Sequence, residues 1–224
     1  MNTFDPIWET KYAAGHAQRY PWDCVVSFVY RQAPRDRSRG NGNVLEVGCR
    51  TGLNLWFAAR EGFAVAGLDA SPSAFDAARR RFETEGLQGD LWVGLCHELP
   101  WEDESVDLAI DRWSLMRVGH AVQRQAVAEV YRVLRPGGVF FSNGYSERHS
   151  SAQAGVRQPD GRVTGIARGT LVGAGGLHFS THGDIETLFA DLGEILVLEH
   201  VEVENLALMD ERRHTEWRIV ARKT

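Results

Sequence analysis

The sequence VLEVGCRTG, residues 44–52, decides the fold because a glycine-rich turn here joins a short apolar run to the start of a helix. Glycine has no Cβ, so the backbone turns tightly at Gly48 and Gly52 and a ligand can approach the main chain. The free N–H groups at the start of the following helix favour a carboxylate or a phosphate. The turn therefore predicts a binding site at the end of the first strand.

Apolar runs and helical patterns alternate through the middle of the chain. Ser71 and Pro72 are the residue types expected at the cap and the first turn of a helix. We expect strands at residues 44–47, 64–68, 91–95, 106–110 and 139–142, and helices at residues 53–60, 72–85 and 121–134. Strands that alternate with helices of these lengths predict an α/β fold, with a parallel sheet and right-handed crossovers.

The end of the chain breaks this alternation. A helical pattern at residues 183–192 is followed by two strand patterns, at residues 194–203 and 216–222, with no helix between them. Two strands joined in this way are expected to pair antiparallel.

Two segments lie outside the core pattern of what we expect to be a single domain over residues 1–224. Residues 1–40 predict a helical arm with several aromatic side chains, and an arginine-rich loop at its end. Residues 145–182 are rich in Gly, Ser, Arg and His and have little periodicity. A connection of this length in a compact domain is usually a lid or a binding loop.

The composition excludes several classes of protein. A net charge of -5 and a pI near 5.9 argue against a protein built mainly to hold nucleic acid or an anionic membrane. Three scattered cysteines predict neither a disulfide framework nor a zinc site, and no motif requires a metal. The first residues have no apolar signal region, and no run is long enough to span a membrane, so we expect a cytoplasmic protein.

An acidic residue ends the second strand. Asp69 lies 21 residues beyond Gly48, where a carboxylate accepts hydrogen bonds from both hydroxyls of an adenosine ribose. A dinucleotide site would have the spacing GxGxxG, whereas this turn has GxxxG, with Glu46 two residues before its first glycine. The acid therefore predicts a cofactor that contains adenosine, and the glycine spacing argues against a dinucleotide.

This region resembles motif I of the class I S-adenosylmethionine (SAM)-dependent methyltransferases, which is usually E-x-G-x-G-x-G. Three further stretches resemble motifs of the same family: GLDAS at residues 67–71, LPWEDESVDLAID at 99–111 and EVYRVLRPGGVFF at 129–141. The resemblance implies a Rossmann-like, seven-stranded, mostly parallel sheet with an antiparallel last strand and helices on both faces. It also implies SAM as the cofactor.

The resemblance and the arm together suggest which residues bind SAM. Tyr12 and Tyr20 in the arm either close over SAM or pack the arm onto the core. Arg50 replaces the middle glycine of the motif, and we expect its side chain to point outward. Leu95 stands where the family often has an acid for adenine, and His97 is a candidate substitute. The expected cofactor residues are Glu46, Gly48, Cys49, Gly52, Asp69, Ala70, Cys96, His97, Asp111, Trp113, Tyr12 and Tyr20.

Methyl transfer chiefly requires that the acceptor be aligned and water be excluded. Asp111 and Arg112 follow the fourth strand, at the edge where the acceptor should lie. Asp111 is expected to take a proton or orient a donor, and Arg112 to pair with an acidic substrate; the alternative is a capped, salt-bridged loop. His178 is a candidate catalytic or binding residue, because it lies in GAGGLHFSTHGD, where the glycines favour close ligand approach or a mobile lid.

Three functions remain open at this point. The preferred one is methyl transfer to an oxygen or nitrogen of a small molecule, with oxygen slightly favoured. A nucleic-acid (RNA) methyltransferase is less favoured, because Asp111-Arg112-Trp113-Ser114 has no (N/D/S)PP(Y/F/W) motif and no Pro-Cys nucleophile is present. A catalytically degenerate SAM-binding protein is the third. We expect a small-molecule methyl acceptor as partner, no nucleic acid or membrane, and a monomer or homodimer.

Overall fold

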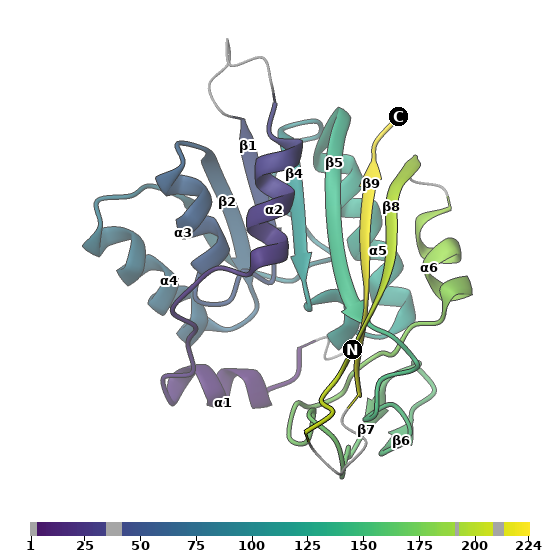
Figure 1. The fold of residues 1–224 in the computed structure, drawn as a ribbon. Helices are drawn as coiled ribbons and strands as arrows, with labels where there is room; N and C mark the ends of the chain where they lie inside the picture. The colour runs from purple at the N-terminus through teal and green to yellow at the C-terminus, as the bar shows by residue number, and fades with distance from the viewer. Residues whose placement is uncertain (1–3, 35–41, 191–192, 208–212) are drawn as a thin grey trace.

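The structure is a computed structural model that describes residues 4–34, 42–190, 193–207 and 213–224 (Figure 1). Its helices are α1 (Ile7–Ala13), α2 (Asp23–Gln32), α3 (Leu53–Arg60), α4 (Pro72–Thr84), η2 (Leu115–Arg117, a 3-10 turn), α5 (His120–Val133) and α6 (His182–Phe189). Its strands are β1 (Asn43–Val47), β2 (Ala64–Asp69), β3 (Asp90–Val93), β4 (Val106–Arg112), β5 (Leu134–Tyr145), β6 (Val156–Arg157), β7 (Val163–Thr164), β8 (Glu194–Glu204) and β9 (Arg213–Arg222).

Seven strands form one sheet in the order β3-β2-β1-β4-β5-β9-β8. The pairs from β3 to β5 are parallel, while β9 pairs antiparallel with both β5 and β8. The last strand of the chain is thus the one that runs against the others, which confirms the predicted sheet. In the register, Val47 faces Leu68 on one side and Asp111 on the other, so β1, β2 and β4 end at one edge.

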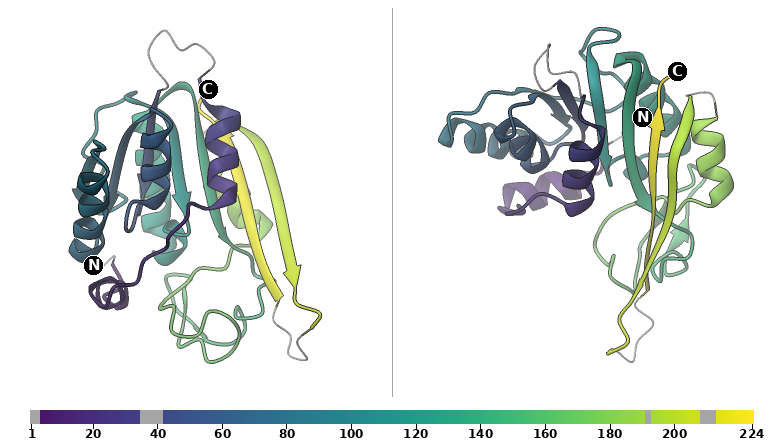
Figure 2. Two further views of the ribbon diagram at one scale, coloured as in Figure 1. Left: turned by 60° about the vertical axis from the view of Figure 1, so that its left-hand side comes forward. Right: turned by 45° about the horizontal axis from the view of Figure 1, so that its top comes forward.

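Helices cover both faces of the sheet, as predicted (Figure 2). On one face, Phe28 of α2, Leu55 of α3 and Phe82 of α4 belong to one apolar cluster with residues of β1, β4 and β5. On the other face, Val130 of α5 and Phe189 of α6 belong to a second cluster. The helical period places these side chains on one stripe of each helix, which is how an amphipathic helix buries its apolar side.

Strand β5 begins earlier than expected. The Pro136-Gly137-Gly138 sequence was expected to separate α5 from a strand at 139–142, but Leu134 already pairs with Val106. The register shifts before the next pair, so the proline and glycines lie in an irregular part of the strand rather than in a separate loop.

The segment at residues 145–182 packs against the carboxyl end of the sheet (Figure 1). It contains the short β6–β7 hairpin and an apolar cluster that includes Leu177 and Phe179. Backbone hydrogen bonds fix it to the end of β5 and to η2, because the N–H of Ser180 donates to Tyr145 O (2.9 Å) and that of His178 to Met116 O (2.7 Å).

Helix α1 lies across the same edge of the sheet (Figure 1). Its Glu9 carboxylate accepts hydrogen bonds from the hydroxyls of Ser71 and Ser73 at the start of α4, and this contact lowers the pKa of Glu9. The arginine-rich loop at residues 35–41 lies outside the described residues. Among the described helices, none is long and apolar enough to cross a membrane.

Candidate functional site

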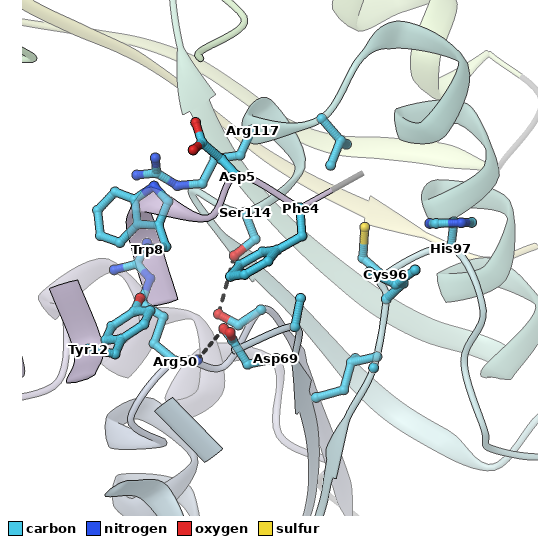
Figure 3. Close-up of a pocket in the computed structure, with 16 residues that line it drawn as sticks. Phe4, Asp5, Trp8, Tyr12, Arg50, Asp69, Cys96, His97, Ser114 and Arg117 are labelled. Atoms are coloured by element: carbon cyan, nitrogen blue, oxygen red, sulfur yellow. Dashed lines mark hydrogen bonds between the residues drawn. The ribbon is translucent and has the colours of Figure 1, made fainter. Parts of the chain in front are cut away.

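Two adjoining chambers lie where α1 faces the carboxyl ends of β1, β2 and β4. The first chamber, of about 630 Å³, is shown in Figure 3, and the second measures about 810 Å³. The first is lined by Phe4, Asp69, Ala70, Cys96, His97 and Ser114 among others; the second by Glu46, Asn54, Trp22, Trp113, Tyr145 and Leu171 among others. Trp8, Tyr12, Arg50 and Arg117 line both.

Asp69 lies at the end of β2 on the wall of the first chamber. Its carboxylate accepts hydrogen bonds from the backbone N–H groups of Arg50 and Ser71, each at 2.9 Å. Burial raises the pKa of Asp69, while these two bonds oppose that rise. The bonds hold the carboxylate beside the glycine-rich turn, where the sequence placed it.

Glu46 lies at the other end of the site, on the wall of the second chamber. One of its oxygens accepts a hydrogen bond from Asn54 Nδ2 at 2.7 Å. The other oxygen is buried and has no hydrogen-bond partner among the described residues. Burial raises the pKa of Glu46 to about 8. A buried acceptor without a partner is rare in proteins, so this oxygen is suited to a cationic or donor group of a ligand.

The glycine-rich turn brings its main chain into the site. Gly48 has a φ of +68° and lines the first chamber; a Cβ there would meet Ser114 Oγ at 2.0 Å. Gly52 has a φ of +70°, and a Cβ there would meet Ala78 Cβ at 2.9 Å. Both positions therefore require glycine. Cys49 lines the second chamber, and its buried thiol has a pKa well above the usual value.

Arg50 does not point outward. It has a φ of +54°, and its Nη2 donates to the carbonyl oxygen of Arg112 at 2.6 Å. The side chain thus crosses from the turn to the end of β4 and lines both chambers. The reason is that the turn faces β4 directly, so a long side chain in its middle finds a carbonyl acceptor there.

Cys96 and His97 line the first chamber on the side away from Tyr12 (Figure 3), and Ala70 also lines this chamber. The Nδ1 atom of His97 is buried and has no partner among the described residues. Burial raises the pKa of the Cys96 thiol to about 12. These three residues are brought together as the sequence predicted.

Asp111 and Arg112 end β4, but neither is among the residues that line the two chambers. The Asp111 carboxylate accepts hydrogen bonds from the N–H groups of Ser114 and Leu115 and from the Ser142 hydroxyl, at 2.8, 3.0 and 2.9 Å. The structure therefore places Asp111 as a buried cap of the following turn, and burial raises its pKa.

The guanidinium of Arg112 is sandwiched between two indoles behind the second chamber. It lies 4.2 Å from the ring centroid of Trp22 and 3.2 Å from that of Trp113, and 4.0 Å from Glu216. Its Nε and Nη1 are buried without a partner among the described residues. Trp113 itself lines the second chamber and has a φ of +63°. Arg112 thus supports the wall of the chamber rather than facing into it.

His178 lies apart from both chambers. Its Nε2 is 3.2 Å from Nδ1 of His120 at the start of α5, and the two rings meet edge to face. Burial and the neighbouring His120 lower the pKa of His178 to about 4. The ring packs against His120 of α5, so its place in a glycine-rich stretch does not bring it to the site.

The two tyrosines of the arm have different places. Tyr12 in α1 is buried and lines both chambers, and burial raises its pKa above the usual range. Tyr20 is 78% exposed and lines neither chamber. The expected cofactor contact at Tyr20 is therefore a mismatch with this structure, because the chain turns outward between α1 and α2.

Arg117 was missed by the sequence reasoning. It extends from η2, its Nε donates to Trp113 O (3.1 Å) and its Nη1 to Ala174 O (3.0 Å). Its guanidinium lies 3.9 Å from the ring centroid of Trp8 (Figure 3). Burial and the nearby Arg50 lower the pKa of Arg117 to about 10. A single arginine within the apolar sequence LMRVG was the only available signal.

Comparisons with known proteins agree with this arrangement. Residues 44–138 match the family model described as "Methyltransferase domain". A SAM-dependent methyltransferase from Methanosarcina mazei has the same fold, with a TM-score of 0.72 at 20% identity over 92% of this chain and 99% of that one. The family match over residues 44–138 and the fold shared over most of the chain are both consistent with a class I SAM-dependent methyltransferase.

Two further similarities concern particular proteins. A probable phthiotriol/phenolphthiotriol dimycocerosates methyltransferase of Mycobacterium ulcerans is 32% identical over 124 residues, which are 54% of this chain and 45% of the relative. A structure from work on the conversion of a disulfide bond into a thioacetal group during echinomycin biosynthesis has a TM-score of 0.71 at 21% identity, over 98% of this chain and 93% of that one. The chain spans less than half the length of the curated relatives it matches.

Proposed function

We propose that the protein transfers the methyl group of SAM to an oxygen or nitrogen of a small molecule. The observation that carries this proposal is the pair of adjoining chambers, with the Asp69 carboxylate in one and the unpartnered oxygen of Glu46 in the other. These groups match two polar parts of SAM, namely its ribose hydroxyls and its ammonium group.

The residues present fit SAM along its whole length. Asp69 would accept from the ribose hydroxyls, and the wall formed by Ala70, Cys96 and His97 would hold the adenine. The turn at Gly48 leaves room for the cofactor to pass close to the main chain. Glu46 would accept from the ammonium group, which favours the charged form of this carboxyl group.

Bound SAM supplies a methyl group on a cationic sulfur, which an acceptor lone pair displaces in line, so that the carbon–sulfur bond breaks as the new bond forms. The protein's part is to align the acceptor and keep water away. Trp22 and Trp113 would orient the acceptor, and Tyr12 of α1 would close the site above it. Leu171 and Ala174 add a wall from the segment at residues 145–182.

The enclosed second chamber favours a small acceptor. Its walls come from α1, the end of β4 and residues 171–174, so an acceptor there is surrounded by protein on several sides. The names of the mycobacterial relative and of the echinomycin structure refer to natural products rather than to nucleic acids. Both observations support a small-molecule methyl acceptor.

Calorimetric titration with S-adenosylhomocysteine (SAH), with NAD as the control, tests the cofactor. We expect SAH to bind with micromolar affinity and NAD not to bind. Asp69→Ala should weaken SAH binding at least tenfold, whereas Asp76→Ala on the outer face of α4 should leave it unchanged. If SAH does not bind, or if both variants behave alike, the proposed site is wrong.

A further inference from the structure

The two chambers hold positive charges that lack carboxylate partners. Arg50 and Arg117 line both chambers, and among the described residues no carboxylate lies within ion-pair distance of either guanidinium. Their printed hydrogen bonds go to the carbonyl oxygens of Arg112, Trp113 and Ala174, which are neutral. Partly buried guanidinium groups are normally paired with an anion, so we expect a ligand of this site to supply one.

The nearby carboxyl groups do not supply that anion. Asp69 is held by the backbone N–H groups of Arg50 and Ser71, and Asp5 by those of Ile7 and Gly176. Both carboxylates are bound by the main chain and lie beyond ion-pair distance of the guanidinium groups, but their charges still act there. Asp5 opposes the fall in the pKa of Arg117, and Arg50 and Arg117 oppose the rise in the pKa of Asp69.

Further charge in and around the site adds to the positive excess. Lys11 adds a positive charge at the rim, where its Nζ lies 4.5 Å from the ring centroid of Trp8. SAM, with a cationic sulfur and a zwitterionic methionine end, would bring one more net positive charge. An anionic acceptor would reduce the resulting excess.

Aromatic rings and hydrogen-bond donors line the second chamber. Trp8, Trp22, Trp113 and Tyr145 line it, and the ring centroids of Trp113 lie 5.1 Å from those of both Trp22 and Tyr145. The indole N–H groups of Trp8, Trp22 and Trp113 are buried without an acceptor among the described residues. Aromatic walls favour a planar ligand, and unpartnered donors favour one that carries acceptor oxygens.

We propose that the methyl acceptor is a small planar molecule with a carboxylate group, and that Arg117 binds this carboxylate in the second chamber. Arg117 is the better placed of the two arginines, because it bonds to Trp113 and Ala174 of this chamber and packs on Trp8. Arg50 belongs to the glycine-rich turn, so we assign it to the cofactor rather than to the acceptor. This inference rests on the proposed function and specifies its substrate class.

The first test uses the unaltered protein saturated with SAH. Benzoate, 4-hydroxybenzoate and indole-3-carboxylate are each titrated beside the matching neutral amide, and the fluorescence of the chamber tryptophans reports binding. We expect at least one carboxylate to bind at least tenfold more tightly than its amide, since a charged hydrogen-bond partner is lost in the amide. Equal affinities for every pair, or no carboxylate binding at all, would overturn the inference.

The second test asks whether Arg117 is the residue that binds the carboxylate. Arg117→Met should weaken carboxylate binding at least tenfold and SAH binding by a clearly smaller factor, while Arg117→Lys should give an intermediate carboxylate affinity. Arg79→Met on the exposed side of α4 is the matched control and should change neither affinity. If Arg117→Met weakens SAH as much as the carboxylate, Arg117 binds the cofactor and the inference is wrong.

These outcomes separate the two proposals. Failure of SAH to bind the unaltered protein refutes the methyltransferase site itself. SAH binding without discrimination between carboxylate and amide refutes only the acceptor class. If Arg117→Met does not fold, as judged by its melting curve, Arg117→Lys and the comparison of carboxylate with amide on the unaltered protein decide.

Discussion

Replacing Glu46 by Gln should stabilise the empty protein in a pH-dependent way. The Glu46 carboxyl is buried, with its pKa raised from 4.5 to about 8. Below pH 4.5 it is protonated in both the folded and the unfolded chain. Between pH 4.5 and 8 it is ionised only in the unfolded chain, so the folded state binds more protons and stability falls as the pH rises.

The size of this effect follows from the two pKa values. At about 1.4 kcal/mol for each pH unit, the free energy of unfolding is reduced by about 3 kcal/mol at pH 7 and by about 5 kcal/mol above pH 8. Gln carries no charge and keeps an oxygen that can accept from Asn54. The variant should therefore be more stable than the parent by an amount approaching these values at neutral pH, and equal to it near pH 4.

Urea unfolding of both proteins at pH 4, 5.5, 7 and 8.5, without ligand, measures the difference in the free energy of unfolding. Comparing the pair removes the contributions of Asp69 and Asp111, whose pKa values are also raised by burial. Glu83→Gln on the exposed face of α4 is the control. A difference that stays constant across this pH range would refute the reasoning, because it would mean that the pKa of Glu46 is the same in the folded and the unfolded chain.

Other substitutions test which residues in and around the two chambers affect SAH binding. Tyr12→Ala should weaken SAH binding severalfold, whereas Tyr20→Ala should leave it unchanged because that ring is exposed; titration calorimetry would contradict the placement of α1 if the two variants ranked in reverse. His178→Ala should lower the melting temperature by a few degrees and leave SAH affinity within twofold, since the ring packs on His120; lost affinity with an unchanged melting temperature would place His178 in the site instead. Glu9→Gln should weaken SAH binding severalfold and raise its dissociation rate, because the contact with Ser71 holds α1 over the chambers; stopped-flow dissociation with an unchanged rate would argue against closure by α1.

Local signals explain why much of the fold could be predicted. The turn at Gly48 needs a residue without a Cβ, and the acid at Asp69 ends a strand that must lie beside β1. The two residues lie about twenty positions apart, so one short stretch of sequence contains both signals. The antiparallel ending was predictable for the same reason, since two strands without a helix between them can pair only as a hairpin.

The parts that could not be predicted depend on contacts between distant segments. Lys11 donates to Gly173 O across 162 residues of sequence, and Arg117 bonds to Ala174 O across 57. Only the folded chain brings α1, η2 and residues 171–174 to one place, so the aromatic and cationic character of the second chamber has no local pattern. The prediction for His178 does not match the structure for a different reason. Its glycine neighbours suggested a ligand site, but its ring packs against His120, away from both chambers.

The charges of the empty site explain how ligand binding and stability are connected. Glu46 is buried and protonated at neutral pH with one oxygen unpaired, while Arg50 and Arg117 lack carboxylate partners among the described residues, so the empty site leaves polar and charged groups unpaired at a cost in folding free energy. SAM would pair its ammonium group with Glu46 and the acceptor would pair its carboxylate with Arg117, so a ligand of either kind relieves part of this cost. Because such a ligand binds only the folded chain, it raises the melting temperature with its concentration. The Glu46→Gln variant should gain stability when empty and gain less than the parent protein when SAH is added, since the group that makes the empty site unstable is the one that pairs with the cofactor.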